Sequence, residues 1–304
     1  MKILFIGGTR FVGRHAVTSA LSRGHDVTIF HRGETNKGIF PDVTEVLGDR
    51  NKDLDKLTGN WDAVVDACGY VPGSVRATVE ALGARTSCYA FVSTISVYDV
   101  KEQSTLNEES RVLEADFDSK EITADTYGPL KVACEQVLAD TNVLVFRPGL
   151  VVGPLDYTDR FTYWPVSFQQ FEEVFVPERL SQPVQYIDGR DLGAFVIHAL
   201  EASLTGTYNV VADSLDFRTL TAHCPNPERA KPVDLGNVLL PMVLPSDGTE
   251  DAIFRVDNSR ARQSGLKTRS LQTTVAETLQ WWESNDRPTL KVGPNPAEVR
   301  MQLS

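Results

Sequence analysis

A glycine-rich turn near the N-terminus limits the folds open to this chain more than any other feature of its sequence. Residues 7–13, Gly-Gly-Thr-Arg-Phe-Val-Gly, follow the apolar run 2–6 and lead into a stretch, 10–23, whose apolar residues recur with a helical period. Gly7 allows a tight turn, and Gly13 allows the helix to pack close to the sheet. Free amides at the start of such a helix, together with its dipole, attract a phosphate group. We therefore expect a phosphate-binding turn formed by Gly7, Thr9, Arg10, Phe11, Val12 and Gly13; the alternative is an ordinary strand–helix connection.

Short β-rich runs and helical stretches continue to alternate along the first two-thirds of the chain. Strands are predicted at 27–30, 43–47, 62–66, 88–93 and 142–147, with a helix at 127–139 before the last of them. This order indicates right-handed parallel crossovers and an α/β fold with a doubly wound parallel sheet, the Rossmann architecture. In such a sheet, ligands bind beyond the carboxyl ends of the strands. Each candidate residue below should therefore lie at such an end.

The pattern becomes less regular after residue 150, where prolines are frequent. A helix at 188–202, a strand at 207–211 and a late helix at 271–284 are predicted, with long loops across 221–250. We therefore expect a dinucleotide-binding domain over 1–150 and a smaller substrate lobe over 151–304, interleaved with elements that return to the first domain.

Composition argues against several classes of function. The chain has 304 residues and a formal net charge of −11, which argues against binding to nucleic acid or to an anionic membrane surface. We find neither a signal peptide nor an apolar run of the roughly 20 residues that a membrane span requires, so a cytoplasmic protein is expected. The four cysteines form no CxxC pair and the five histidines have no metal-ligand spacing, so we expect reduced thiols and no metal.

Basic residues follow the second predicted strand, where a site selective for NAD would place Asp or Glu to bind the ribose hydroxyls. His31 and Arg32 stand there instead. Arg32 can bind a 2′-phosphate, and Arg10, which replaces a glycine of the usual fingerprint, can join it. NADP(H) is therefore favoured over NAD(H), the alternative being that Arg32 is a solvated surface residue. Asp49, after the third strand, is placed to contact adenine, or is simply a turn former.

A phenol and an amine stand four residues apart on the helix at 127–139. Tyr127 and Lys131 therefore share one helix face. A tyrosine pKa is normally about 10, and a nearby ammonium lowers it toward the range useful for proton transfer. Thr94, with Ser96 beside it, follows the fifth strand and offers a hydroxyl to a substrate oxygen; the alternative for each hydroxyl is a turn or cap group. The turn, the hydroxyl and the Tyr/Lys pair together are more specific than any one of them.

These motifs resemble the short-chain dehydrogenase/reductase superfamily, and within it the extended or atypical branch of NAD-dependent epimerases and dehydratases. The resemblance is carried by residues 7–13, 30–33, 66–70, 93–98, 127–131, 147–154 and 186–192. It implies that Tyr127 is the general acid/base, Lys131 its activator and ribose anchor, and Thr94 the group that orients the substrate. It also implies that Cys68 and Gly69 lie against the cofactor and that Pro148 and Gly149 lie beside the nicotinamide.

The sequence departs from the family pattern where sugar-nucleotide dehydratases have an acidic pair. Ile95 and Ser96 stand at those positions, so the elimination of water lacks its acid and base. Residues 156–164 are expected to enter the substrate pocket, and Ser96, Arg160 and Tyr163 are the candidate substrate contacts. The alternative for the aromatic residues of this segment is the core of the smaller lobe.

We therefore predict an NADP(H)-dependent oxidoreductase that acts on a small carbonyl or secondary alcohol. The first alternative is a nucleotide-sugar epimerase that retains NAD(P) and uses the same groups. The second is a non-catalytic NAD(P)-binding sensor or scaffold, against which the intact pair of Tyr127 and Lys131 speaks. Extended members of the family often dimerise through helices that include the Tyr/Lys helix, so a homodimer is compatible with the sequence.

Overall fold

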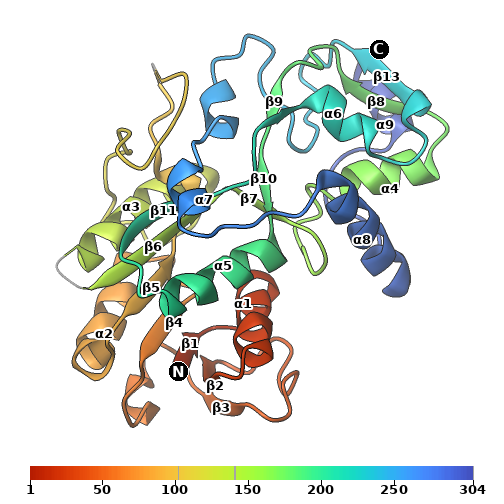
Figure 1. Cartoon of the computed structure of the whole chain (residues 1–304). Coiled ribbons are helices and arrows are strands. Elements are labelled where there is room, and N and C mark those ends of the chain that lie inside the picture. The colour runs from red at the N-terminus through yellow and green to blue at the C-terminus, as the bar shows by residue number, and fades with distance from the viewer. Residues whose placement is uncertain (102, 140–141, 304) are drawn as a thin grey trace.

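A parallel sheet of seven strands forms the centre of the computed structural model, which describes residues 1–101, 103–139 and 142–303 (Figure 1). In spatial order its strands are β11 (Gly206–Val210), β6 (Val143–Pro148), β5 (Tyr89–Val92), β4 (Ala63–Asp66), β1 (Lys2–Ile6), β2 (Asp26–His31) and β3 (Thr44–Leu47). The strand order reverses between β1 and β4, which is where such sheets open a ligand crevice. The doubly wound α/β fold predicted from the sequence is confirmed.

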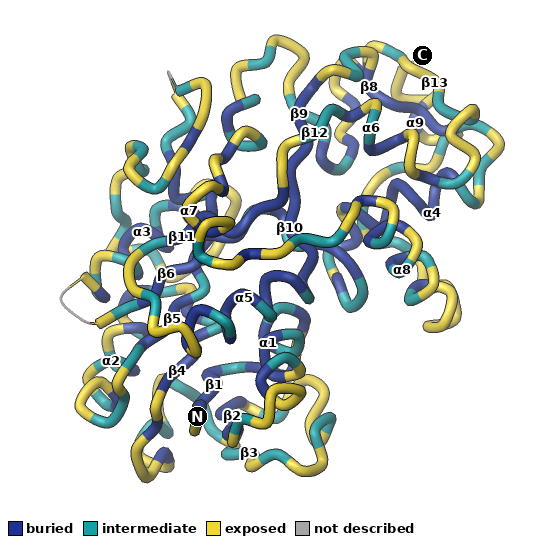
Figure 2. Tube along the Cα trace, in the orientation of Figure 1, coloured by how far each residue is buried: buried dark blue, intermediate teal, exposed yellow. Residues whose placement is uncertain are grey.

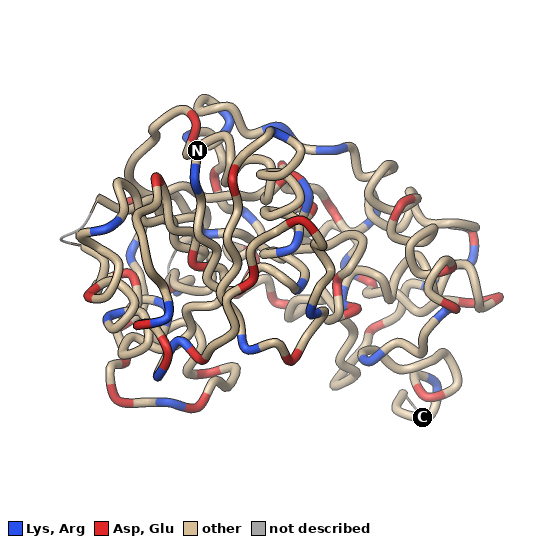
Figure 3. The backbone as a smooth tube through the Cα atoms, turned by 90° about the horizontal axis from the view of Figure 1, so that it is seen from below, with Lys and Arg blue, Asp and Glu red and all other residues tan. Residues whose placement is uncertain are grey.

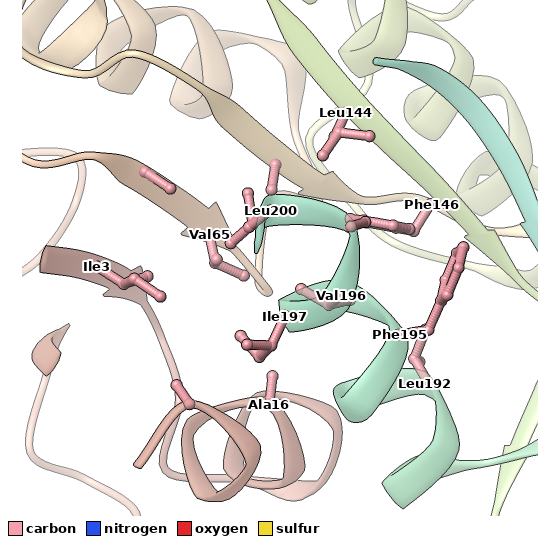
Figure 4. Packing of buried hydrophobic residues seen from close by; sticks show 14 of the residues in the cluster. Ile3, Ala16, Val65, Leu144, Phe146, Leu192, Phe195, Val196, Ile197 and Leu200 are labelled. Atoms are coloured by element: carbon pink, nitrogen blue, oxygen red, sulfur yellow. The ribbon is translucent and has the colours of Figure 1, made fainter. Parts of the chain in front are cut away.

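Two pairs of helices cover the two faces of this sheet. Helices α1 (Phe11–Ser22) and α5 (Gly189–Glu201) pack on one face, and α2 (Pro72–Leu82) and α3 (Ala124–Leu138) pack on the other. Figure 4 shows the first face, where side chains of α1 and α5 meet those of the strands. Since both faces are covered, the inner strands β1, β4, β5 and β6 are largely buried and rich in apolar residues, as the dark central strands of Figure 2 show, while the edge strand β3 is partly exposed.

Side-chain caps mark the beginnings of several helices. Thr123 forms a capping box with Thr126 at the start of α3, and Asp188 accepts a hydrogen bond from the amide of Arg190 at the start of α5. Gly193 lets α5 approach α1 closely, because a side chain there would come within 2.7 Å of the Ala16 amide nitrogen. The caps thus fix where α3 and α5 begin, and Gly193 fixes how closely α5 packs on α1.

The smaller lobe is built from short paired strands and helices. Its strand pairs are β7 (Leu150–Val152) with β10 (Tyr186–Asp188), β8 (Val174–Pro177) with β13 (Ala230–Val233), and β9 (Pro183–Val184) with β12 (Leu215–Asp216). Its helices are α4 (Tyr163–Gln170), α6 (Phe217–Ala222), α8 (Leu271–Ser284) and α9 (Pro296–Leu303), whereas the short helix α7 (Ser259–Gln263) packs on β11 of the large domain. The 3-10 turns of the large domain are η1 (Leu54–Lys56), η2 (Gly83–Arg85) and η3 (Ile95–Val97), and those after residue 150 are η4 (Pro227–Arg229) and η5 (Asp251–Phe254). Trp164 lies at the centre of this lobe, edge-on to Tyr163 and Phe217.

The two lobes interleave along the chain. Although α5 and β11 follow residue 150, they belong to the large domain, since β11 pairs with β6 and α5 packs on α1. The stretch 221–250, predicted as loops, contains β13, whose four residues are too few to carry a recognisable period. Lys and Arg positions are interspersed with Asp and Glu positions along the chain (Figure 3). Among the described helices, none has the length and apolar character needed to cross a membrane.

Candidate active site

A cavity of about 1030 Å³ opens at the carboxyl edge of the central sheet. The phosphate turn, residues 7–13, and the ends of β2, β4, β5 and β6 form one side of it. The first half of α3, the loop 153–160 and η5 form the other side. The cavity therefore spans the junction between the large domain and the smaller lobe, at the place predicted from the order of the strands.

The phosphate turn has the backbone that an anion site requires. Gly7 and Gly8 have φ values of +89° and +117°, which only glycine adopts readily. A Cβ atom on Gly13 would come within 2.8 Å of the Gly8 Cα atom, so the start of α1 lies directly against the turn. Arg10, the N-cap of α1, makes no side-chain cap hydrogen bond, which leaves the first amides of the helix to a ligand. All residues of the turn line the cavity, and their geometry fits the pyrophosphate of a dinucleotide.

The end of β2 brings together a cation and an anion. A guanidinium nitrogen of Arg32 lies 3.0 Å from a carboxylate oxygen of Glu34, and both residues line the cavity. Gly33, with φ of +77°, turns the chain so that the two side chains meet. The sequence analysis named Arg32 and missed Glu34, because an acidic residue beyond the strand end falls outside the usual pattern.

A buried ion pair lies under the same end of the cavity. Arg50 binds both carboxylate oxygens of Asp66, at 2.9 and 2.7 Å, and Tyr89 donates a third hydrogen bond at 2.8 Å. Burial by itself would raise the pKa of Asp66, but the charge and hydrogen bonds of Arg50 hold that pKa below its usual value. Asp49 also lines the cavity, and its carboxylate accepts a hydrogen bond from the Asn51 amide at 2.8 Å, as a turn former does. Sequence reasoning missed Arg50, which has no motif of its own.

The candidate proton-transfer residues meet at the ends of β5 and β6. Thr94, Ser96, Tyr127 and Lys131 all line the cavity. Gly128 makes this possible, because a larger residue there would collide with the backbone oxygen of Ser96 and push α3 away from η3. The Thr94 hydroxyl accepts a hydrogen bond from the Ser96 amide at 3.1 Å and donates one to the Ser96 hydroxyl at 3.2 Å. One local turn thus orients both hydroxyls.

The electrostatic surroundings of Tyr127 differ from those expected. Burial raises its pKa, while a hydrogen bond with the Thr94 side chain and the charge of Arg160 act in the opposite direction. The ammonium of Lys131, expected to lower the pKa of this phenol, instead donates hydrogen bonds to the carbonyl oxygens of Val92 at 2.6 Å and Gly69 at 2.8 Å. The cation placed to act on the phenol is thus Arg160, from the loop 153–160.

Lys131 is itself strongly perturbed. Its side chain is only 2% exposed, and burial lowers its pKa to about 8. Its two carbonyl partners belong to the ends of β4 and β5, so it ties together the two segments beneath the cavity. Three residues that were predicted to contact the cofactor line the cavity, namely Cys68, Pro148 and Gly149. Gly69 reaches the site only through its carbonyl oxygen, which Lys131 binds.

The structure separates the two aromatic alternatives for the segment 156–164. Arg160 is exposed and lines the cavity. Tyr163 does not line it: the start of α4 turns its ring into the smaller lobe, where its hydroxyl donates to the Pro294 carbonyl at 2.9 Å. Placing Tyr163 among the substrate contacts was therefore wrong, and the core interpretation of the aromatic residues describes it. Cavity residues without any sequence signal include Lys120, Ile122, Met242, Ile253 and Phe254.

A family model and several solved structures match this chain. The model of the NAD dependent epimerase/dehydratase family matches residues 3–211. A UDP-glucose-4-epimerase from Stenotrophomonas maltophila, with bound NAD and formylated UDP-arabinopyranose, is 18% identical with a TM-score of 0.72, and the match covers 94% of this chain and 99% of that one. A UDP-glucuronic acid 4-epimerase from Bacillus cereus in complex with NAD is 16% identical with a TM-score of 0.71, covering 94% and 99%.

A third solved structure is similar over nearly the same share of the chain. It is a UDP-N-acetylglucosamine 4-epimerase from Methanobrevibacter ruminantium in complex with UDP-N-acetylmuramic acid, 19% identical with a TM-score of 0.71, covering 93% of this chain and 98% of that one. A comparison with curated proteins found no match. At these identities the solved structures establish the shared fold.

Proposed function

Because this chain belongs to the NAD dependent epimerase/dehydratase family, we propose that it is an epimerase that inverts a secondary alcohol of a nucleotide sugar while NAD(P) stays bound. Family membership makes it an NAD(P)-dependent enzyme of the short-chain dehydrogenase/reductase type. The sequence analysis placed a reductase first and the epimerase second. The family, together with the UDP-sugars named for the similar structures, supports the epimerase better.

The observation that carries the proposal is the convergence of Thr94, Tyr127 and Lys131 on the cavity that also contains the phosphate turn. In its phenolate form Tyr127 takes the proton of the substrate hydroxyl, and as the resulting phenol it later returns that proton, while the Thr94 hydroxyl holds the same oxygen. When bound, the nicotinamide supplies a two-electron acceptor and donor at the adjacent carbon. The net reaction consumes no cofactor, because the alcohol is restored with the opposite configuration.

Dehydration and epimerisation differ in the acids and bases they need. Among the described residues that line the cavity, the carboxylates are Glu34 and Asp49, which lie at the ends of β2 and β3. Beside Thr94 stand Ile95 and Ser96. Within the described lining of the cavity, no carboxyl group thus stands beside Thr94 to remove the proton that elimination of water requires, whereas epimerisation needs the phenolate of Tyr127 together with the nicotinamide.

The end of the cavity formed by the smaller lobe suits an anionic, ring-bearing substrate. Arg160 supplies positive charge there, Met242, Ile253 and Phe254 supply apolar surface, and Lys120, from the segment before α3, adds a second cation to the lining of the same cavity. A guanidinium binds phosphate oxygens strongly and directionally. A nucleotide sugar carries a diphosphate for the cations and a base for the apolar side chains.

Cofactor choice depends on the pair at the end of β2. The preference for NADP(H) that Arg32 predicts meets a competing group in Glu34, whose carboxylate can accept hydrogen bonds from ribose hydroxyls. The similar structures named above as NAD complexes are consistent with NAD(H) at such a site. The NADP(H) preference thus stays a prediction, and a test of it is given in the Discussion.

The proposal is tested with the purified full chain and three probes: UDP-glucose, UDP-glucuronic acid and UDP-N-acetylglucosamine. We expect the 4-epimer of at least one probe to form, with no net change in nicotinamide absorbance. Tyr127→Phe should lower the rate by roughly 100-fold or more while NADH still binds, since general acid–base catalysis contributes that much. Stoichiometric oxidation of added NADPH with a carbonyl substrate, and no epimer from any probe, would instead establish the reductase.

A further inference from the structure

Arg10 departs from the usual glycine fingerprint, and its side chain has a defined partner on the opposite side of the crevice. The guanidinium carbon lies 3.5 Å from the centroid of the Tyr157 ring. Phe11, the next residue, meets the same ring edge-on at 6.1 Å. Two consecutive residues of the phosphate turn thus hold one aromatic side chain of the loop 153–160.

A second contact fixes the start of that loop to the same helix. A ring nitrogen of His15 lies 3.0 Å from the carbonyl oxygen of Pro154, and the ring of Phe11 packs against His15. Between these contacts the fully buried Asp156 shapes the loop, because its carboxylate accepts hydrogen bonds from the amide and hydroxyl of Thr158 at 2.8 and 2.7 Å. The loop is therefore held over the start of α1 in a fixed course.

The position of this contact relates it to the phosphate site. Arg10, Phe11 and Tyr157 line the same cavity as Gly7 and Gly8. Tyr157 remains 38% exposed, although its ring is held on two sides. Within the part of the chain that the structure describes, Arg10 has no carboxylate partner, so stacking occupies its face and leaves its N–H edge for an anion.

We propose that Arg10 and Tyr157 form a clasp over the pyrophosphate of the bound dinucleotide and thereby set how long the cofactor stays bound. Arg10 donates from its N–H edge to the phosphate oxygens while its face rests on the Tyr157 ring. This role replaces the one predicted from the sequence, in which Arg10 joined Arg32 at a 2′-phosphate. The inference extends the proposed function, since an epimerase must keep its reduced cofactor until the second half of the reaction.

Release of the cofactor measures the clasp directly. The dissociation rate of NADH is followed by fluorescence after mixing the NADH-loaded full chain with excess NAD⁺, and the same is done with NADPH. Arg10→Gly, which restores the family glycine, and Tyr157→Ala should each raise this rate roughly 10- to 100-fold, the range expected for losing a charge-assisted contact. Tyr157→Phe keeps the ring and is the matched control, expected within about threefold of the unaltered chain.

A double variant tells a clasp from two independent contacts. With both residues changed, the rate should be close to that of the more severe single variant, because each change already opens the clasp. Unchanged release from Arg10→Gly, fully multiplicative effects in the double variant, or an equal effect of Tyr157→Phe would each overturn the proposal. Circular dichroism and thermal unfolding verify that the variants are folded. Since no sugar substrate is used, this result is independent of whether the chain is an epimerase.

Discussion

Reciprocal changes at Arg32 and Glu34 should move the cofactor preference of this chain in opposite directions. The two side chains are 3.0 Å apart at the edge of the cavity. A guanidinium favours a 2′-phosphate, while a carboxylate favours ribose hydroxyls and repels that phosphate. Arg32→Ala should therefore shift binding toward NAD(H), and Glu34→Gln should shift it toward NADP(H).

The size of each shift follows from how exposed the two groups are. Their side chains are 64% and 62% exposed, so the pair itself contributes at most about 1 kcal/mol to stability and both variants should fold. A hydrogen bond to a charged group contributes about 1.5–3 kcal/mol, and exposure places Arg32 at the lower end. The ratio of the NADPH dissociation constant to the NADH dissociation constant should therefore rise roughly 10-fold in Arg32→Ala. Glu34→Gln removes a repulsion of about 1 kcal/mol between the carboxylate and the 2′-phosphate, so the same ratio should fall roughly fivefold.

Fluorescence titration of NADH and NADPH against the full chain and both variants provides the assay. The ratio of the two constants is the quantity to compare, because it cancels any general change in affinity. Raising the salt concentration should shrink both shifts, since exposed charges are screened. If neither variant changes the ratio, Arg32 is a solvated surface residue and the reasoning from the end of β2 fails.

Two further predictions concern residues outside the proton-transfer group. Arg147→Ala should lower the free energy of unfolding by about 3–5 kcal/mol, because it removes the cation that lies 2.6 Å from the largely buried carboxylate of Glu135 and leaves that charge with the hydrogen bond from the Ser93 hydroxyl; urea unfolding measures this, and a loss below about 1 kcal/mol would mean that water solvates the carboxylate. Tyr163→Phe should cost about 1 kcal/mol in the same assay and leave NADH affinity and turnover unchanged, because its hydroxyl binds Pro294 in the core; altered turnover would return Tyr163 to the substrate site.

Much of the large domain could be predicted because its strands are buried on both faces. The sequence reasoning placed β1 at 2–6 and α8 at 271–284, the bounds that the structure has. Helix α2 went unpredicted, although Val75 and Leu82 lie on its buried face, because Pro and Gly at its beginning interrupt the pattern. In the smaller lobe, strands of two to four residues are too short for a period to appear.

Site residues that are positioned by the strands of the sheet could also be predicted from the sequence. Thr94 lies two residues beyond the end of β5, and Tyr127 lies on the helix that connects β5 to β6, so topology alone brings both to one edge. The partners of Lys131 could not be foreseen, because they are backbone carbonyl groups, which every residue has. Lys120 and Phe254 come from segments whose course depends on tertiary packing, and no motif surrounds them.

The departures from the family pattern become interpretable only through contacts across the crevice. Judged by the motif, Arg10 is a defect in a phosphate site; stacked on Tyr157, it is one of three residues of the large domain, with Phe11 and His15, that hold the loop 153–160. The same loop carries Arg160, whose charge opposes the effect of burial on the pKa of Tyr127. One loop thus connects the phosphate turn with the proposed general acid/base. Opening the clasp with Arg10→Gly should therefore change the pKa of the Tyr127 phenol as well as the rate of cofactor release. It should do so although the substitution brings the sequence of the turn closer to the family pattern.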